Sequence, residues 1–204
     1  VSTRPGAFWS VICNEGELLE RFGVETVPLT MVDVEHGVRD MLQSNHRDML
    51  AIRDDIRSRI PNIRFSDDEL KRVAALKAVL RNWAEQEGLS AIGIQCWSAL
   101  QKSTSCNTCF VDADLTDDGL PTVCETDIHG AITSLLLQAA RFGQSPVFFA
   151  DLTIRHPENP NAELLWHCGT FPYSLARDPK QAELVGNGCP GVGDDIERTE
   201  SGEE

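Results

Sequence analysis

Short apolar runs alternate with amphipathic helical patterns along most of the chain, and this alternation constrains the fold more than any other feature. Alternating strands and helices are typical of βαβ units, whose strands run parallel. The sequence therefore predicts an α/β fold: a mostly parallel, Rossmann-like sheet with helices on both faces, in three αβα layers. The runs that we predict to be strands are 7–13, 24–31, 91–95, 120–124, 146–150 and 163–166. The run 106–110 is ambiguous.

The helices are predicted from apolar spacing and from their end signals. One helix is expected over 15–22, and a long one from Val34 to Ile56. Ser66 and Glu69 form a capping box, in which the Ser66 hydroxyl accepts a hydrogen bond from the Glu69 N–H. The helix that begins there should end at Gly88. A last helix is expected after the strand 120–124, with a buried stripe of Ala131, Ile132, Leu135, Leu136 and Ala139.

The length of 204 residues allows one good-sized domain, or one domain and part of a second. We expect a central α/β domain over 1–172. Residues 173–204 are polar, and 194–204 carry six acidic side chains against Arg198. Like-charge runs usually form solvated tails, so 173–204 are predicted to be an acidic tail or the start of a further domain. The opening residues read as neither a translation start nor a signal, so the natural protein is expected to extend upstream.

Charge and cysteine content exclude several classes of partner. The net charge of −14 would be repelled by nucleic acid or by an anionic membrane surface. The sequence has no secretory signal and no apolar run of about 18 residues, which indicates a cytoplasmic protein. Seven cysteines are an odd number, and most lie in apolar segments. Thiols stay reduced in the cytosol, so Cys106 and Cys109 are expected to be reduced and metal-free.

Three potential metal ligands follow three predicted strands: Glu125, Asp151 and His167. Ligands bind beyond the carboxyl ends of strands in open α/β sheets. Two carboxylates and an imidazole suit Mn²⁺ or Mg²⁺. A structural interpretation stays open beside this one, because acidic residues at such turns often cap helices. Asp127 is better placed for a cap or a supporting role than for binding metal.

Several segments resemble the L-fucose/L-arabinose isomerase family. PTVCETDIHG at 121–130 and FFADL at 148–152 resemble the centre of L-fucose isomerase, and GIQCW at 93–97 resembles its strand with a substrate-binding glutamine. Residues 4–31 resemble the opening of the family's second domain. His167-Cys168-Gly169 resembles a turn that supplies a metal-binding histidine in arabinose isomerase. The resemblance covers nearly all of this chain but only the middle of a family member.

The resemblance implies an aldose–ketose isomerase that works through an enediol. It implies that Glu125 and Asp151 bind metal and exchange protons with the substrate, that Gln95 binds the sugar, and that His167 is a third metal ligand. The implied cofactor is Mn²⁺, or another divalent cation such as Mg²⁺ or Co²⁺. The implied assembly is a homo-oligomer. The family's other domains are missing from the sequence, so this piece alone is expected to bind metal weakly and to be inactive.

Two other functions compete with the isomerase. Cys106-Asn107-Thr108-Cys109 is a C-x-x-C motif, and Cys96, Cys124 and Cys168 could join it in a zinc-binding module. No second C-x-x-C pairs with it, which weakens that interpretation. The chain could also be a non-catalytic sugar-binding or scaffolding domain that kept the isomerase fold, because a fold does not determine a function.

Overall fold

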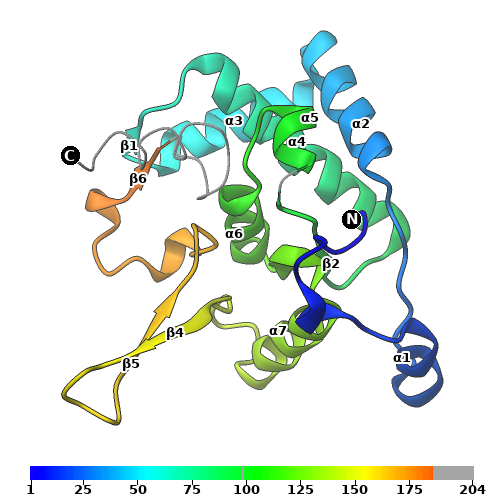
Figure 1. Cartoon of the computed structure of the whole chain (residues 1–204). Helices are drawn as coiled ribbons and strands as arrows, with labels where there is room; N and C mark the ends of the chain where they lie inside the picture. The colour runs from blue at the N-terminus through cyan, green and yellow to red at the C-terminus, as the bar shows by residue number, and fades with distance from the viewer. Residues whose placement is uncertain (98, 186–204) are drawn as a thin grey trace, which may run out of the picture.

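Three helices form the largest packed unit of the protein. The computed structural model describes residues 1–97 and 99–185. The long helix α4 (Asp67–Glu87) packs against both α2 (Met31–Gln43) and α3 (Arg47–Arg59). These helices lie together at the top of Figure 1. Leu70, Leu76 and Leu80 of α4 are fully buried between them, so the main apolar core is helical.

The helix ends that were predicted from capping residues are confirmed. Ser66 and Glu69 form the capping box at the start of α4, with the Ser66 Oγ accepting from the Glu69 N–H at 3.3 Å. Gly88 ends α4 in the left-handed conformation, with φ of 64°. Gly23 ends α1 (Glu15–Phe22) in the same way. Glycine has no Cβ and therefore takes this conformation without strain.

The single helix predicted from Val34 to Ile56 is wrong, because the segment forms α2 and α3 with a turn between them. Asn45 takes a left-handed φ of 46° in that turn, a conformation that asparagine tolerates better than most residues. His46 then caps α3, its Nδ1 accepting from the Asp48 N–H at 3.3 Å. The apolar spacing is continuous through the turn, so periodicity alone did not reveal it.

Two of the predicted strands form a parallel pair. β2 (Ile92–Gly93) pairs with β3 (Thr122–Val123) in parallel register. The N-terminus extends this pairing, since the Val1 amine donates to the Gly93 carbonyl and the Gln95 N–H donates to the Val1 carbonyl. Figure 1 shows the N-terminus beside β2 in the middle of the molecule. The parallel pairing of these two strands agrees with the prediction, although no helix was predicted between them.

Three other predicted strands are wrong. The run 7–13 contains the 3₁₀ helix η1 (Trp9–Val11), and residues 24–30 form no regular element before α2 begins. The run 146–150 is not a strand either. Its backbone pairs with no strand among the described residues, and its side chains make individual contacts instead. Phe148, for example, stacks on Phe171 with ring centroids 4.4 Å apart. A short apolar run does not by itself make a strand, and in the run 7–13 both Trp9 and Ile12 are exposed.

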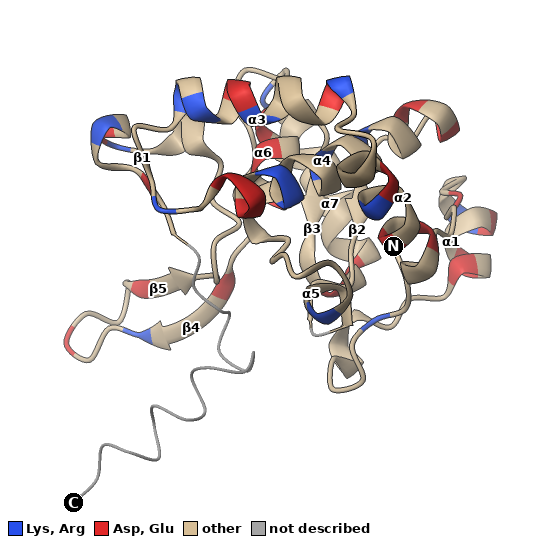
Figure 2. Ribbon diagram, turned by 90° about the horizontal axis from the view of Figure 1, so that it is seen from above, with Lys and Arg blue, Asp and Glu red and all other residues tan. Residues whose placement is uncertain are grey.

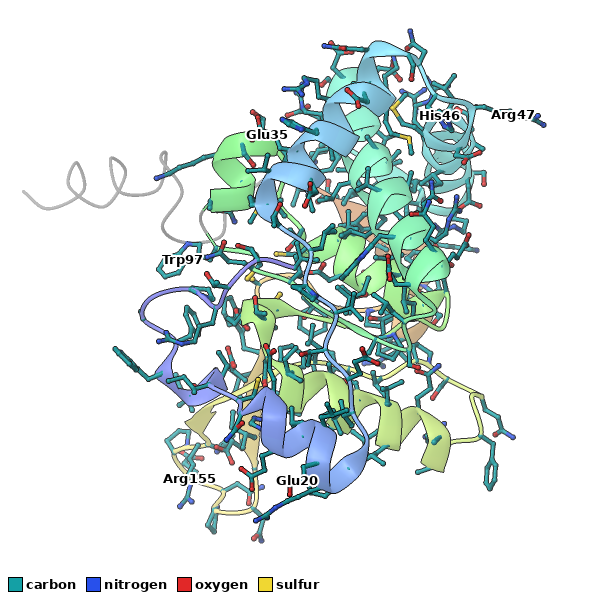
Figure 3. All side chains as sticks on the ribbon, turned by 90° about the vertical axis from the view of Figure 1, so that its right-hand side faces the viewer. Glu20, Glu35, His46, Arg47, Trp97 and Arg155 are labelled. Carbon is teal, nitrogen blue, oxygen red and sulfur yellow. The ribbon has the colours of Figure 1, made fainter. Side chains whose placement is uncertain are left out.

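A protruding antiparallel ribbon takes the place of further parallel strands. β4 (Asp151–Arg155) pairs with β5 (Glu163–Trp166), with Asp151 opposite Trp166. The ribbon projects from the body in Figure 1. In Figure 3, Arg155 of the ribbon lies far from His46 and Arg47 at the start of α3. β5 was predicted correctly, although not its antiparallel partner.

The described part of the chain is therefore mixed α/β with small sheets, each of two strands. The third sheet joins β1 (Asn62–Ile63) to β6 (Glu183–Leu184) in parallel register. The extended three-layer sheet that we predicted is not formed by these residues. The domain boundary at 172 stays a prediction; residues 173–185 lie against the body, where the Ser174 N–H donates to Asp117. The acidic run 194–204 lies outside the described residues.

Two short helices and one longer helix surround β2 and β3. α5 (Ala99–Thr104) and α6 (Cys109–Asp117) lie between them in sequence, and α7 (Ile128–Ala140) follows β3. The ambiguous run 106–110 leads into α6. The buried stripe predicted for α7 is partly wrong: Ala131 is buried, but Leu136 is 67% exposed.

Charge is distributed unevenly over these elements. Acidic and basic residues are interspersed along α3 in Figure 2, whereas the strands β4 and β5 carry fewer charged residues, namely Asp151, Arg155 and Glu163. None of the helices within the described ranges is both long enough and apolar enough to cross a membrane. The 3₁₀ helices η3 (Tyr173–Leu175) and η4 (Pro179–Gln181) complete the chain up to β6.

Candidate functional site at the ends of β2 and β3

Glu125 lies on a strained turn directly after β3. The turn is the 3₁₀ segment η2 (Cys124–Thr126), in which Glu125 and Thr126 both have φ of 57°. Side chains with a Cβ rarely adopt this conformation, and each such residue costs about 1–3 kcal/mol. The Thr126 N–H donates to the Ile94 carbonyl at 3.0 Å, which holds the turn against β2. The turn thus places the half-buried Glu125 at the carboxyl edge of the parallel pair.

Two thiols surround the Glu125 carboxylate. The Cys96 thiol lies 3.5 Å from Glu125 Oε1. Cys96, Cys124 and Glu125 each offer one ligand atom, and these three atoms all lie within 4.8 Å of one another. The Cys124 thiol also donates to Asp112 Oδ2 at 3.4 Å. The hydrogen bond with Cys96, burial and the nearby Asp112 raise the pKa of the Cys124 thiol well above its ordinary value.

Asp127 caps the helix that follows, as predicted. Its Oδ1 accepts from the Gly130 N–H at 2.9 Å, in the first turn of α7. This interaction satisfies one of the unpaired N–H groups at the start of the helix. The side chain of Asp127 therefore has a capping role at the start of α7.

Asp151 and His167 lie together at the base of the ribbon. Asp151 is exposed and pairs with Trp166, the residue before His167. His167 is 4% exposed, and its ring lies 5.5 Å from that of Phe149. The Cys168 sulfur lies 3.5 Å from His167 Nδ1. The histidine thus has a structural role at the ribbon base, whatever else it does.

The structure does not gather the three predicted metal ligands into one cluster. Among residues 1–97 and 99–185, only Cys96, Cys124 and Glu125 form a compact group of three potential ligands. Gln95, the predicted sugar-binding residue, lies two residues after β2 and immediately before Cys96 of this group. Glu125 and Gln95 therefore share one strand edge, while Asp151 and His167 lie at the ribbon base.

Phe149 connects these two places. A Cβ built on Gly130 would lie 2.8 Å from Cε2 of Phe149 and 2.7 Å from Oδ2 of Asp127. The helix that follows the Glu125 turn therefore touches the aromatic ring on which His167 packs. The Thr170 hydroxyl donates to the Phe149 carbonyl at 3.0 Å and fixes the same segment.

This close approach predicts the effect of replacing Gly130. Gly130→Ala should lower the free energy of unfolding by about 1–2 kcal/mol, because overpacking against Phe149 outweighs the gain in helix propensity. Urea unfolding of the two proteins measures the difference. Gly6→Ala is the control, since a Cβ there meets nothing within 4 Å. Equal stability of wild type and Gly130→Ala would contradict the contact.

A second group of thiols lies apart from Glu125. The sulfur atoms of Cys109 and Cys168 are 3.5 Å apart. Both residues line a cavity of about 980 Å³ between α4, α6 and the segment 168–185. Cys106, the other cysteine of the C-x-x-C motif, donates to the Asn107 carbonyl at 3.3 Å. Aromatic, aliphatic and polar side chains line the cavity together, and Gln95, Glu125, Asp151 and His167 are not among its lining residues.

The sequence prediction missed the pairing of Cys96 and Cys124 with Glu125. The signal was present, because Cys96 follows Gln95 and Cys124 precedes Glu125 at the ends of two predicted strands. Residues after neighbouring parallel strands meet at one edge. The C-x-x-C motif instead suggested that these cysteines join Cys106 and Cys109.

Curated relatives of the chain are sugar isomerases by name. No family model matches the sequence. A sulfoquinovose isomerase from Alkalicoccus urumqiensis is 27% identical over 183 residues, which cover 90% of this chain and 40% of the relative. A sulfoquinovose isomerase from Priestia megaterium is 27% identical over 172 residues, or 84% of this chain and 37% of the relative. A third, from Clostridium sp., is 29% identical over 103 residues, or 50% of this chain and 22% of the relative.

The chain spans about two-fifths of the length of the first curated relatives that it matches. These relatives agree with the sugar isomerase expected from the sequence. Their names do not include the L-fucose and L-arabinose isomerases that its motifs resemble.

Proposed function

We propose that this chain is part of an aldose–ketose isomerase that acts on a sugar. The observation that carries the proposal is the similarity to sulfoquinovose isomerases along 90% of the chain. A half-buried carboxylate at the carboxyl edge of parallel strands supports it, since this edge is where α/β proteins bind small molecules.

The proposed substrate is sulfoquinovose or a closely related sugar. The printed names of the relatives favour it over L-fucose and L-arabinose, which the motif resemblance suggests. The sugar would lie against Gln95, whose amide can both donate to and accept from hydroxyl groups.

Glu125 is the proposed group for proton transfer between adjacent sugar carbons. A carboxylate serves as general base when its surroundings bring its pKa toward the operating pH. Glu125 is half-buried beside two thiols, so it is shielded from bulk water on one side. Asp151 is the proposed second carboxylate of the reaction.

The proposed cofactor is a divalent cation, Mn²⁺ or alternatively Mg²⁺ or Co²⁺, with Glu125, Asp151 and His167 as ligands. Such an ion would supply a Lewis acid for the oxygens of the sugar. Two carboxylates and one imidazole have suitable chemistry, but their ligand atoms do not form one compact group in this chain. The arrangement of the described residues therefore does not fit the full ligand set, and no catalytic step is assigned to the metal.

The remaining parts of the proposal concern the whole protein. We place the enzyme in the cytoplasm as a homo-oligomer. The chain alone offers at most three of the about six ligands that Mn²⁺ prefers, so additional polypeptide or subunits would complete the site. The polar residues of an open site stay in water, which weakens electrostatic stabilisation of the transition state.

The experiment compares two polypeptides with four sugars. The 204-residue chain and a polypeptide of the relatives' length that carries it are each incubated with sulfoquinovose, L-fucose, L-arabinose or D-arabinose, with Mn²⁺ or Mg²⁺. We expect the longer protein to isomerise sulfoquinovose and the chain alone to show little or no turnover. Ketose formation is followed by NMR.

Two other outcomes are informative. If the folded, longer protein binds sugar saturably but turns over none of the sugars, the isomerase proposal is wrong and a sugar-binding domain is favoured. Substantial turnover by the 204-residue chain would show that this chain contains a complete site.

A further inference from the structure

The group around Glu125 has the composition of a site for a thiophilic cation. Cys96 follows β2, and Cys124 and Glu125 follow β3, so adjacent parallel strands bring the three side chains together. The Ile94 N–H donates to the Val123 carbonyl at 2.9 Å, and the Thr126 N–H donates back to the Ile94 carbonyl at 3.0 Å. These backbone bonds fix the register on which the group depends.

The backbone of the turn holds the carboxylate close to the thiols. Glu125 and Thr126 both take a left-handed φ of 57°, although neither is glycine. Strain of this kind persists only where the surrounding structure maintains it, and it is concentrated at functional sites. Cys96 and Cys124 are 4% and 0% exposed, and Glu125 is the member of the group that solvent reaches.

The spacing of the ligand atoms matches a tetrahedral ion. Zinc bonds are about 2.3 Å to sulfur and about 2.0 Å to a carboxylate oxygen. At the tetrahedral angle, a sulfur and an oxygen bound to one ion are therefore about 3.5 Å apart. Cys96 Sγ and Glu125 Oε1 are 3.5 Å apart in the structure. The remaining separations, within 4.8 Å, need only small side-chain adjustments.

The chemistry of the group selects the kind of ion. Two sulfur ligands favour Zn²⁺ and other soft or borderline cations over Mn²⁺ and Mg²⁺, which prefer oxygen. Three protein ligands leave a fourth tetrahedral position for water. The Cys124 thiol is also oriented by Asp112, whose Oδ2 accepts both from it and from the Thr108 hydroxyl at 2.9 Å.

We propose that Cys96, Cys124 and Glu125 bind a thiophilic divalent cation such as Zn²⁺, and that this binding withdraws Glu125 from the sugar. Binding forms two metal–sulfur bonds and one metal–oxygen bond, and it releases the two thiol protons to solvent. The second part of the inference rests on the proposed function, in which Glu125 moves the proton of the sugar. A thiophilic ion would then inhibit the enzyme.

In the test, Co²⁺ is added as a spectroscopic probe to the 204-residue chain. A phosphine reductant is present to keep the thiols reduced. We expect one equivalent of Co²⁺ to produce a thiolate-to-cobalt band in the near ultraviolet and the visible bands of tetrahedral Co²⁺. Zn²⁺ should then displace it. Cys96→Ser and Cys124→Ser should each weaken binding by about 100-fold or more, because each removes a direct ligand.

Matched controls separate this site from the other thiols. Cys106→Ser alters a buried cysteine outside the group and should leave the spectrum unchanged. Circular dichroism verifies that each variant is folded, and Cys96→Ala provides a second variant if the serine is not tolerated. A spectrum that survives in Cys96→Ser and Cys124→Ser, or that disappears in Cys109→Ser, would overturn the proposal. So would the absence of a thiolate band in the wild-type chain.

The outcome is independent of the isomerase proposal. If Co²⁺ does not bind, the cation-site proposal is wrong, but the longer protein can still be an isomerase. If Co²⁺ binds and no sugar is isomerised, the cation site is supported and the isomerase proposal is wrong. If both hold, Zn²⁺ should inhibit the wild-type enzyme, and Cys96→Ser should lower the sensitivity to Zn²⁺ by about 100-fold.

Discussion

Asp114→Ala is expected to lower the free energy of unfolding by about 3–5 kcal/mol, the largest loss of stability that we predict for a single side chain. Asp114 lies on α6 and is 2% exposed. Its carboxylate accepts from Arg59 Nη2 at 2.8 and 3.1 Å and from the Lys77 ammonium at 2.5 Å. Lys77 lies on α4 and is 3% exposed, so removing the carboxylate leaves a buried positive charge with less compensation.

A matched control lies on the same lysine. Asp118 also pairs with Lys77, at 2.6 Å, but the Asp118 side chain is 53% exposed. Asp118→Ala should therefore cost less than about 1 kcal/mol, as solvent-exposed pairs do. Urea unfolding of both variants with far-ultraviolet detection measures the difference. Equal losses in the two variants would show that burial of Asp114 is not what makes its ion pairs important.

This ion-pair network also shows what sequence patterns leave out. Lys77 belongs to a helix whose start and end were predicted correctly from Ser66, Glu69 and Gly88. Nothing in the spacing indicates that a lysine is buried there, because its partner is 37 residues away in sequence. Local capping chemistry is readable because its donors and acceptors are sequence neighbours, whereas a tertiary pair is not.

The errors in the sheet have a related cause. The runs 91–95 and 120–124 do contain paired parallel strands, but 7–13 and 146–150 do not. An apolar run does not contain the partner that would make it a strand, and that partner must come from elsewhere in the chain. Phe148 is an example: it stacks on Phe171, 23 residues later, and not on a neighbouring strand.

The position of the candidate site was predicted only in part, because the pairing of strands is not visible in the sequence. The prediction that Glu125 follows a buried strand agrees with the structure, in which β3 pairs in parallel with β2. Gln95, close after β2, was assigned from the family resemblance and not from strand-end reasoning. That reasoning also assumed that Asp151 followed a third parallel strand. The structure instead begins an antiparallel strand at Asp151, so this residue and His167 belong to the ribbon base. The expectation that all three ligands meet remains a prediction for the whole protein.

Glu125→Gln is expected to lower kcat by about 100- to 10,000-fold in a polypeptide of the relatives' length, with little change in stability. The amide has the same shape as the carboxylate, and its oxygen can still accept from the Cys96 thiol. It cannot take a proton from carbon at neutral pH. Turnover of sulfoquinovose and urea unfolding, measured on the same preparation, separate the loss of a base from the loss of the fold.

Asp127→Asn is the control for this substitution. Like Glu125→Gln, it replaces a carboxylate by an amide, in an acidic residue two positions away. Asparagine caps helices about as well as aspartate, so the bond from the Gly130 N–H should persist. Turnover should therefore stay within about threefold of wild type, since Asp127 is assigned to the helix and not to the sugar. Near-normal turnover by Glu125→Gln would rule out the proton-transfer role. A comparable loss in both variants would mean that the strained turn itself, and not the Glu125 carboxylate, is what the reaction requires.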